Sequence, residues 1–296
     1  MKKYAYYPGC SLESLAISYH LSALECASAL GLELIEIDDW NCCGATAYFH
    51  ADELLAHTLV ARNLAKAEIM GLDFVAPCSG CYKNAYFTNK YLQQDPDLAD
   101  HINYALEADN LHINGSITVR HLIEIFIEDV GFEEINRRIT HPLRDLRIAP
   151  YYGCQLLRPR KDSEEIENPQ FFEHLLSAIG ADPVIYGSKT RCCGGSLIMT
   201  NRRAALDMVH ILLQDADNCG ADVIATICPL CNMNLELYQK QVNIEFGTNY
   251  SMPVMYFTQL LGLALGISLE RLGINKDMVY PESVLALIHQ KETVLE

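Results

Sequence analysis

The hydrophobic pattern of this 296-residue chain alternates between short apolar runs and longer amphipathic stretches. In the first half, three apolar runs predict strands at Lys3–Tyr7, Leu32–Ile37 and Phe74–Ala76. Apolar residues at helical spacing predict helices at Leu15–Leu30, Asp52–Met70 and Tyr82–Leu92. The similar strings Val119–Phe126 and Val254–Leu261 predict one further apolar helix in each half.

The second half repeats this pattern. Strands are expected at Arg147–Tyr151, Pro183–Tyr186 and Val223–Ile227, and helices at Phe171–Ile179, Arg202–Asp215 and Asn232–Gln241. Strands that alternate with helices indicate βαβ units and a parallel sheet. We therefore expect an α/β protein with two similar βαβ-type domains from an internal duplication, each with a small parallel sheet.

The cysteines repeat with the same pattern. Ten of the twelve form two sets: Cys10, Cys42-Cys43-Gly44 and Cys78-x-x-Cys81, then Cys154, Cys192-Cys193-Gly194 and Cys228-x-x-Cys231. The step from the paired cysteines to the CxxC is the same in both sets, because 43 to 78 and 193 to 228 are both 35 positions. The first step differs, with 32 positions from 10 to 42 and 38 from 154 to 192.

The repeat extends beyond cysteine. Tyr7-Pro8-Gly9-Cys10 matches Tyr151-Tyr152-Gly153-Cys154, and Asn84 and Asn234 each lie three residues after the last cysteine of their set. A long internal period of this kind indicates two similar domains. We place them at 1–135 and 145–275, with a tail at 276–296 and a polar insertion at 158–170 that lengthens the first step in the second copy.

Each group of cysteines follows a predicted strand. In open α/β sheets, ligands bind in the crevice beyond the carboxyl ends of the strands. Three strand ends would therefore bring the five cysteines of one copy into one crevice.

Composition narrows the possible classes of protein. The net charge of −16 lacks the basic balance of a nucleic-acid binder. No targeting segment is visible, and the most apolar late stretch, Tyr256–Leu269, is too short to cross a bilayer. We expect a cytoplasmic protein, in which regularly spaced cysteines act as metal ligands or redox groups.

Five cysteines per copy favour an iron–sulfur cluster over zinc, which takes four ligands. Adjacent residues on an extended chain point apart, so a CysCys pair more naturally reaches different atoms of a larger cluster. A structural zinc site stays open as an alternative, and no CxxCxxCxxxCP run of ordinary ferredoxins occurs. Glycines adjoin the cysteines, either for turns or to let backbone N–H groups approach sulfur: Gly9, Gly44, Gly80, Gly153, Gly194 and Gly195.

The doubled pattern of one cysteine, a CCG string and a CxxC resembles the paired cysteine-rich CCG domains in the B subunit of heterodisulfide reductase. Supporting strings are YYPGCSLES, DWNCCGA, APCSGCY, YYGCQLLRP, RCCGGS and CPLCNMN. The resemblance implies two noncubane [4Fe-4S] clusters. Their ligands would be Cys10, Cys42, Cys43, Cys78 and Cys81 in the first copy, and Cys154, Cys192, Cys193, Cys228 and Cys231 in the second.

The resemblance also implies an activity. In the family, the disulfide of coenzyme M and coenzyme B is cleaved between the two clusters in one-electron steps. The electrons come from two partner chains of the complex, the flavin-containing A subunit together with the ferredoxin-like C subunit. This chain would thus be the catalytic subunit of a complex that reduces a disulfide or oxidises thiols, with no side-chain acid or base assigned.

A second hypothesis is a non-catalytic electron-transfer subunit, since CCG domains also serve lactate, glycolate or succinate oxidoreductases. Two complete motifs favour the catalytic hypothesis, because a simple electron carrier needs no symmetric gap for a substrate.

The remaining candidates have plainer explanations. Cys26 and Cys219 are expected to be buried and to pack as small hydrophobic side chains. Four histidines lie in predicted helices and are expected to pack or face solvent: His20, His57, His121 and His210. His50 has no counterpart in the second copy, and Trp40 is expected to pack over the first cluster.

Basic residues concentrate near the second motif, and Lys83 lies by the first CxxC. Those of the second motif are Arg158, Arg160, Lys161, Lys189, Arg191, Arg202 and Arg203. They indicate either a solvated face or a surface that attracts an anionic substrate or an acidic partner.

Overall fold

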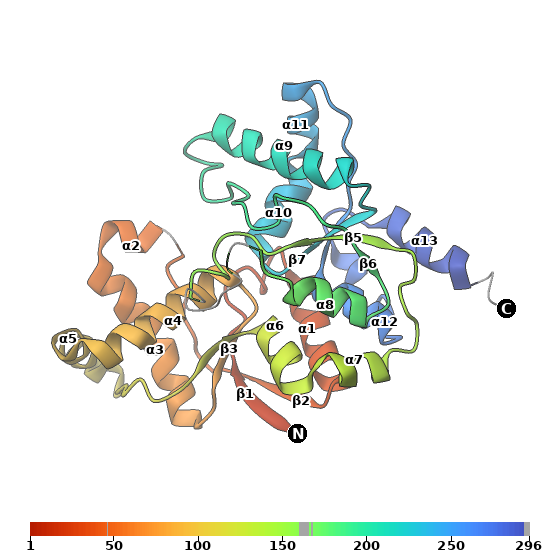
Figure 1. The fold of residues 1–296 in the computed structure, drawn as a ribbon. Coiled ribbons are helices and arrows are strands. Elements are labelled where there is room, and N and C mark those ends of the chain that lie inside the picture. Colours follow the sequence, from red (N-terminus) through yellow and green to blue (C-terminus); the bar gives the residue numbers. More distant parts are fainter. Residues whose placement is uncertain (46, 160–165, 167, 293–296) are drawn as a thin grey trace.

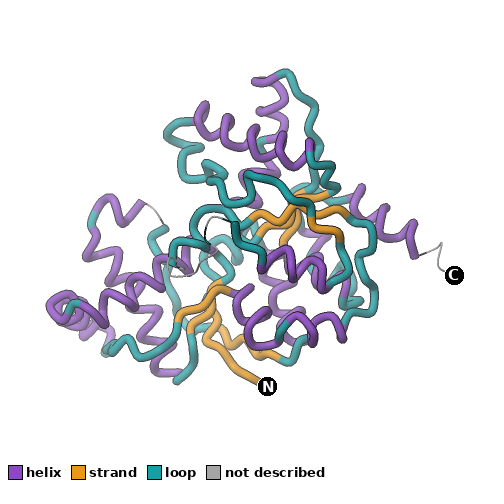
Figure 2. Tube along the Cα trace, in the orientation of Figure 1, coloured by secondary structure: helices purple, strands orange, loops and turns teal. Residues whose placement is uncertain are grey.

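The chain folds into two small parallel sheets flanked by helices, as Figure 1 shows. This computed structural model describes residues 1–45, 47–159, 166 and 168–292. The strands form two separate groups in Figure 2, one in each half of the chain.

The first sheet has the strand order β2-β1-β3-β4, and all neighbours pair in parallel. Its strands are β1 (Lys2–Tyr6), β2 (Leu32–Glu36), β3 (Phe74–Ala76) and β4 (Val119–His121). The inner strands β1 and β3 are mostly buried, as expected for a sheet that is covered by helices on both faces.

The second sheet repeats that topology in the order β6-β5-β7-β8, again with parallel pairs. Its strands are β5 (Arg147–Tyr151), β6 (Asp182–Pro183), β7 (Val223–Thr226) and β8 (Val254–Tyr256). The predicted α/β class with two small parallel sheets is confirmed.

The helices connect and cover the strands. In the first half they are α1 (Ile17–Ala29), α2 (Ala47–Ala51), α3 (Glu53–Met70), α4 (Ser79–Gln94), α5 (Pro96–Leu106), the turn η1 (Glu107–Asp109), α6 (Leu122–Glu124), the π-helix η2 (Ile125–Val130) and α7 (Phe132–Arg138). In the second half they are α8 (Phe171–Ala178), α9 (Arg202–Asn218), α10 (Pro229–Leu237), α11 (Gln239–Phe246), α12 (Phe257–Ala264), the turn η3 (Ile274–Lys276) and α13 (Glu282–Glu292).

The fourth strand of each sheet was expected to be helical. Val119–His121 and Val254–Tyr256 instead pair with β3 and β7, and the helices begin directly after them. A short apolar run does not distinguish a buried strand from a buried helix by its spacing. The helical prediction was therefore wrong for the first three residues of each string.

Smaller differences concern the ends of elements. Helix α4 begins three residues before the predicted start at Tyr82, with Cys78 as its N-cap. The predicted helix Asn232–Gln241 is divided at Tyr238 into α10 and α11. Strand β6 covers Asp182–Pro183 and therefore overlaps the predicted strand Pro183–Tyr186 at Pro183 alone, on a sheet edge where a proline is tolerated.

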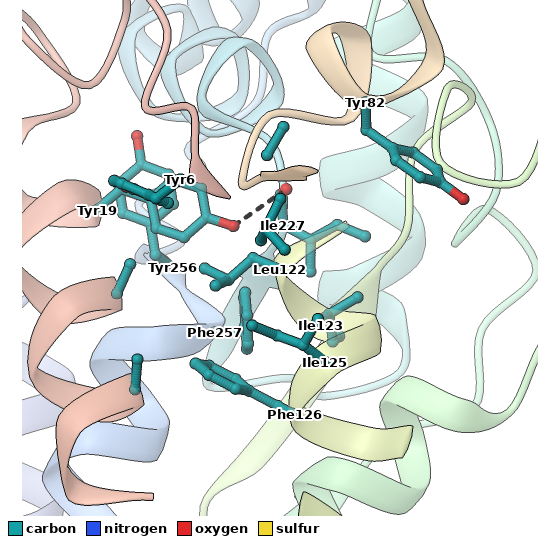
Figure 3. Close-up of a cluster of buried hydrophobic side chains, with 14 of the residues drawn as sticks. Tyr6, Tyr19, Tyr82, Leu122, Ile123, Ile125, Phe126, Ile227, Tyr256 and Phe257 are labelled. Carbon is teal, nitrogen blue, oxygen red and sulfur yellow. Dashed lines mark hydrogen bonds between the residues drawn. The ribbon is translucent and has the colours of Figure 1, made fainter. Parts of the chain in front are cut away.

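One hydrophobic core joins the two halves, because α1 of the first packs against α12 of the second. The ring of Tyr19 on α1 stacks on that of Tyr256 with centroids 4.2 Å apart (Figure 3). Nearby, the hydroxyl groups of Ser22 and Thr258 are 2.6 Å apart, and the Cys26 thiol donates to the Thr258 carbonyl at 3.0 Å. The two halves are thus packed as one body around buried aromatic side chains.

Candidate functional site

Ten cysteines gather beyond the carboxyl ends of the strands. Their thiols form one unbroken row in which each contacts the next, in the order Cys10, Cys42, Cys43, Cys81, Cys78, Cys228, Cys231, Cys193, Cys192 and Cys154. The first five belong to the first copy and the last five to the second, in mirrored order. The sequence prediction that each copy assembles its five cysteines in one crevice agrees with this geometry.

Within each copy the sulfur atoms are close. The Sγ atoms of Cys43 and Cys81 are 3.2 Å apart, and those of their counterparts Cys193 and Cys231 are 3.5 Å apart. Cys10 and Cys42 lie at 3.9 Å in the first copy. All ten thiols are free of disulfide bonds.

The two crevices meet at Cys78 and Cys228, whose thiols hydrogen-bond across the boundary between the halves. The hydroxyl of Tyr19 donates to the carbonyl group of Ile227 at 3.3 Å (Figure 3) and to that of Pro77 at 3.1 Å, and these are the residues directly before Cys228 and Cys78. Sequence reasoning missed Tyr19, because no spacing within one copy reveals a contact that joins the two.

Exposure varies along the row. Cys10 and Cys42 are exposed, whereas their counterparts Cys154 and Cys192 are half-buried. Five thiols nearer the centre are buried: Cys43, Cys81, Cys193, Cys228 and Cys231. Cys78, also near the centre, is half-buried. The row is therefore most open to solvent at its first-copy end.

A tyrosine positions the paired cysteines in each copy. The Tyr7 hydroxyl donates to the Asn41 carbonyl at 2.9 Å, and the Tyr151 hydroxyl donates to the Arg191 carbonyl at 2.7 Å. Asn41 and Arg191 are the residues directly before the CysCys pairs. The matched tyrosines thus fix the entry to each CysCys loop from the end of a sheet strand.

The matched asparagines hold the same loops from the other side. The Asn84 amide donates to the carbonyl groups of Cys43 at 3.3 Å and Ala45 at 2.9 Å. The Asn234 amide donates to the Cys193 carbonyl at 2.5 Å. These residues lie on α4 and α10, so each helix that begins at a CxxC also fixes the CysCys loop opposite it.

Two glycines allow the backbone to approach sulfur. Gly9 has φ +75° and Gly153 has φ +64°, a conformation that other residues rarely adopt. A Cβ atom would lie 3.3 Å from the Cys81 Sγ at Gly9 and 3.2 Å from the Cys231 Sγ at Gly153. A side chain at either position would therefore crowd a cysteine sulfur and hold the backbone in a strained conformation.

Comparisons with known proteins agree with the duplication. The cysteine-rich domain family CCG matches residues 4–84 and 148–236. The B subunit of a ferredoxin/F(420)H(2)-dependent CoB-CoM heterodisulfide reductase from Methanosarcina acetivorans is 34% identical over 295 residues, which is 98% of each chain. The chain belongs to the family of heterodisulfide reductase B subunits. The resemblance inferred from the cysteine strings is confirmed.

Other relatives of this heterodisulfide reductase family member broaden the comparison. An 8-methylmenaquinol:fumarate reductase membrane anchor subunit from Wolinella succinogenes is 35% identical over 280 residues, 94% of this chain and 97% of that one. A crystal structure of a hypothetical protein from Helicobacter pylori has a TM-score of 0.77 at 17% identity. It covers 93% of this chain, which spans 51% of that one, and the likeness concerns the fold alone.

Contacts between neighbouring thiols shift the pKa values of the cysteines along the row of this heterodisulfide reductase homologue. The Cys154 thiol lowers the pKa of Cys192 to about 2, and the thiols of Cys42 and Cys231 hold the pKa of Cys43 and Cys228 well below the usual range. The other seven row thiols have raised pKa values, from neighbouring thiols and burial. Thiolates are the form of cysteine that binds metals.

Helix ends also favour an anionic group here. Cys78 and Cys228 are the N-caps of α4 and α10. The backbone N–H groups of Leu230 and Cys231 at the start of α10 hydrogen-bond to the Cys228 sulfur, and the positive dipole ends of both helices face the cysteines. Five contacting thiols, a glycine against sulfur and a helix N-terminus make each copy fit an iron–sulfur cluster.

Lys83 lies where the two copies approach each other. It is half-buried on α4, with its ammonium nitrogen 5.8 Å from the centre of the Phe49 ring. Burial lowers the pKa of Lys83, the nearby charge of Arg158 lowers it further, and Cys43 and Cys154 raise it. Arg158 also lowers the pKa of Cys192, so both cations lie beside the row.

The other basic residues of the second motif have different roles. Lys189 is buried and pairs with Glu173 at 2.6 Å and the Pro169 carbonyl at 2.7 Å, so it stabilises the fold. Arg203 pairs with Glu245, and Arg191 and Arg202 are exposed. Arg160 and Lys161 lie outside the described residues, as does most of the insertion at 158–170.

The two cysteines outside the row differ in burial. Cys26 is fully buried in the shared core, as expected, whereas Cys219 is half-buried as the C-cap of α9. Trp40 packs edge-on against Tyr7 with centroids 5.3 Å apart and therefore supports the tyrosine that fixes Asn41.

The histidines expected to pack do so. His57 contacts Thr88 at 2.7 Å, and the rings of His210 and Phe246 stack. His121 is fully buried 3.5 Å from Ser79, and His20 lies 3.3 Å from the Tyr6 hydroxyl. His50 is exposed on α2.

Two kinds of site are absent from the part of the chain that the structure describes. Within the described ranges, no three or more His, Cys, Asp or Glu side chains are arranged to hold a single metal ion. No described helix combines the length and apolar character that crossing a bilayer requires.

Proposed function

We propose that this chain binds two noncubane [4Fe-4S] clusters, one in each of two cysteine-rich domains at 1–135 and 145–275. The ligands are the ten thiols of the row, from Cys10 to Cys154. The mirrored order of the row and its junction at Cys78 and Cys228 carry the proposal, because they bring two five-thiol sites face to face.

The chain then acts as the catalytic subunit of a heterodisulfide-reductase-like complex that reduces a disulfide or oxidises thiols. Reduction consumes two electrons and two protons and converts R–S–S–R′ into R–SH and R′–SH. Each bound cluster supplies one electron. Two sites that meet at one point suit a reaction that needs two single electrons at the two sulfur atoms of one bond.

The residues of the chain contribute position and charge. Asn84, Asn234 and the tyrosines Tyr7 and Tyr151 hold the CysCys loops, which fixes the distance between the two sites. Lys83 and Arg158 supply positive charge beside both. They favour a substrate that bears a carboxylate, sulfonate or phosphate group.

Two partner chains deliver the electrons in this proposal, the flavin-containing A subunit together with the ferredoxin-like C subunit. The relative from Methanosarcina acetivorans is named as part of a ferredoxin-dependent reductase, which supports this assignment. The proposed compartment is the cytoplasm, where thiols stay reduced.

An electron-transfer subunit of another oxidoreductase is the second candidate. It is supported by the fumarate reductase subunit from Wolinella succinogenes, which is 35% identical to this chain. In that case the chemistry would take place on another chain.

Anaerobic purification with the natural partners tests both candidates. We expect about eight iron and eight sulfide ions per chain, with loss of cluster in Cys78→Ser and Cys228→Ser and no loss in the control Cys219→Ser. A thiol added under oxidising conditions should produce a new EPR signal, and candidate disulfides should be turned over.

The outcomes separate the hypotheses. Zinc without sulfide would overturn the cluster assignment. Full clusters without a thiol-dependent signal or any disulfide turnover would leave the chain as an electron-transfer subunit.

A further inference from the structure

Two carboxyl groups, the buried Glu236 and the half-buried Asp277, lie near each other in the second copy. Glu236 lies on α10, five residues after Cys231, and is 9% exposed. Asp277 is half-buried and directly follows η3. The pair therefore connects the helix that begins at the second CxxC with the C-terminal segment of the chain.

The groups that donate hydrogen bonds to these two carboxyl groups are uncharged. Asp277 accepts hydrogen bonds from the Gln259 amide at 2.8 and 2.9 Å and from the Ser18 hydroxyl. Glu236 accepts one from the backbone N–H of Val279 at 3.2 Å. Within the described residues, no lysine, arginine or histidine is among the groups that shift the pKa of either carboxyl.

Two buried carboxylates without a cation retain a proton. Burial, and then the charge of Asp277, raises the pKa of Glu236 to about 8. Burial raises the pKa of Asp277 to about 6, against the opposing hydrogen bonds from Ser18 and Gln259. Near neutral pH the pair thus holds one proton, mainly on the more deeply buried Glu236.

Two buried tyrosines lie between this pair and the junction of the cysteine sites. The charges of Glu236, Asp277, Cys228 and Cys78 all act on Tyr256, which is 4% exposed. Its ring stacks on that of Tyr19, whose hydroxyl donates to the carbonyl groups before Cys78 and Cys228 (Figure 3). Asp277, Gln259, Tyr256 and Tyr19 therefore contact one another in that order between the pair and the junction.

We propose that Glu236 and Asp277 hold a proton for the reaction at the junction and take it up from solvent on the side of Asp277. This inference rests on the proposed disulfide chemistry. Cleavage of R–S–S–R′ by two electrons from an iron–sulfur donor protein leaves two sulfur atoms that each need a proton. Glu236 releases one of the two protons and is reprotonated through Asp277, and the second proton comes from solvent.

The first copy differs at the matching positions. Tyr86 occupies the place of Glu236, five residues after the last cysteine. Glu124 is buried there in the place of Gln259, but it accepts hydrogen bonds from the His121 backbone at 2.7 Å and the Tyr82 hydroxyl at 3.2 Å. Proton supply through a carboxyl pair is therefore a property of the second copy.

Redox titration of the complex that carries both iron–sulfur clusters, at several pH values, tests the inference. The potential of the wild-type clusters should fall by about 59 mV per pH unit between pH ~6 and ~8, the value for one proton per electron. The slope should be weakened in both Glu236→Gln and Asp277→Asn, since each variant removes one carboxyl group of the pair. Glu68→Gln is the matched control, since Glu68 is a hydrogen-bonded carboxylate on α3, remote from the row.

A second readout excludes a merely structural effect. The reduced-minus-oxidised infrared spectrum should contain the C=O band of a protonated carboxyl, which disappears in Glu236→Gln and persists in Glu68→Gln. If one variant does not fold, the other still reports on the pair.

The outcomes also separate this inference from the proposed function. Wild type without clusters would overturn both. Clusters with a potential that does not depend on pH, or a slope and band retained in both variants of the pair, would overturn the proton-holding pair alone.

Discussion

Tyr19 shows how much a single side chain contributes at the centre of this molecule. Its hydroxyl donates hydrogen bonds to the carbonyl groups of Pro77 and Ile227, one from each half, and its ring stacks on that of Tyr256. The sequence repeat identifies residues that occur twice, such as Asn84 and Asn234. It carries no signal for a residue that acts once, at the boundary between the copies.

Removal of this hydroxyl should destabilise the junction. In Tyr19→Phe two buried carbonyl groups lose their donor, and we expect the free energy of unfolding to fall by about 1–3 kcal/mol. Denaturant titration of the loaded protein measures the change, with the exposed Tyr104→Phe as control. Equal stability of the two variants would contradict the role assigned to Tyr19.

At the scale of elements, the same construction occurs twice. A tyrosine at or directly after the end of a strand holds the residue before the CysCys pair, and a helix that begins at the CxxC holds the loop with its asparagine. Strands and helices of this unit were predictable from the hydrophobic period. The three-residue strands β4 and β8 were not, because sheet pairing rather than local pattern decides their conformation.

Asn84 and Asn234 should each affect cluster binding in their own copy only. Asn84→Ala and Asn234→Ala each leave buried carbonyl groups without a donor, which costs about 1–3 kcal/mol and loosens one CysCys loop. We therefore expect each variant to lose the iron of one copy, about half of the total, in iron and sulfide analysis. Asn249→Ala, at an exposed position, serves as control. Full iron content in both Asn84→Ala and Asn234→Ala would refute this assignment.

At the scale of the whole molecule, the shared core determines how the two sites meet. Spacing within each copy predicted that five cysteines assemble there. The contact of Cys78 with Cys228 and the position of Lys83 between the copies depend on the packing of α1 against α12. No pattern within one copy encodes that packing, so this part of the site required the structure.

Reversal of charge between the copies should alter the preference for thiols. Lys83→Glu places a negative charge beside Cys43 and Cys154. It should weaken binding of 2-mercaptoethanesulfonate at least tenfold, or about 1.4 kcal/mol. EPR titration of the loaded protein measures this, with 2-mercaptoethanol as the neutral thiol and the exposed Lys240→Glu as control variant. Equal loss for both thiols would show that Lys83 does not select by charge.

The unbroken row of thiols also makes the protein sensitive to oxidation. Neighbouring thiols at such contact distances are one oxidation step from a disulfide. A disulfide between Cys78 and Cys228 would crosslink the two halves at their junction and remove one thiol from each site. The thiols of Cys10 and Cys42 are the exposed end of the row, which an oxidant in solution reaches most readily.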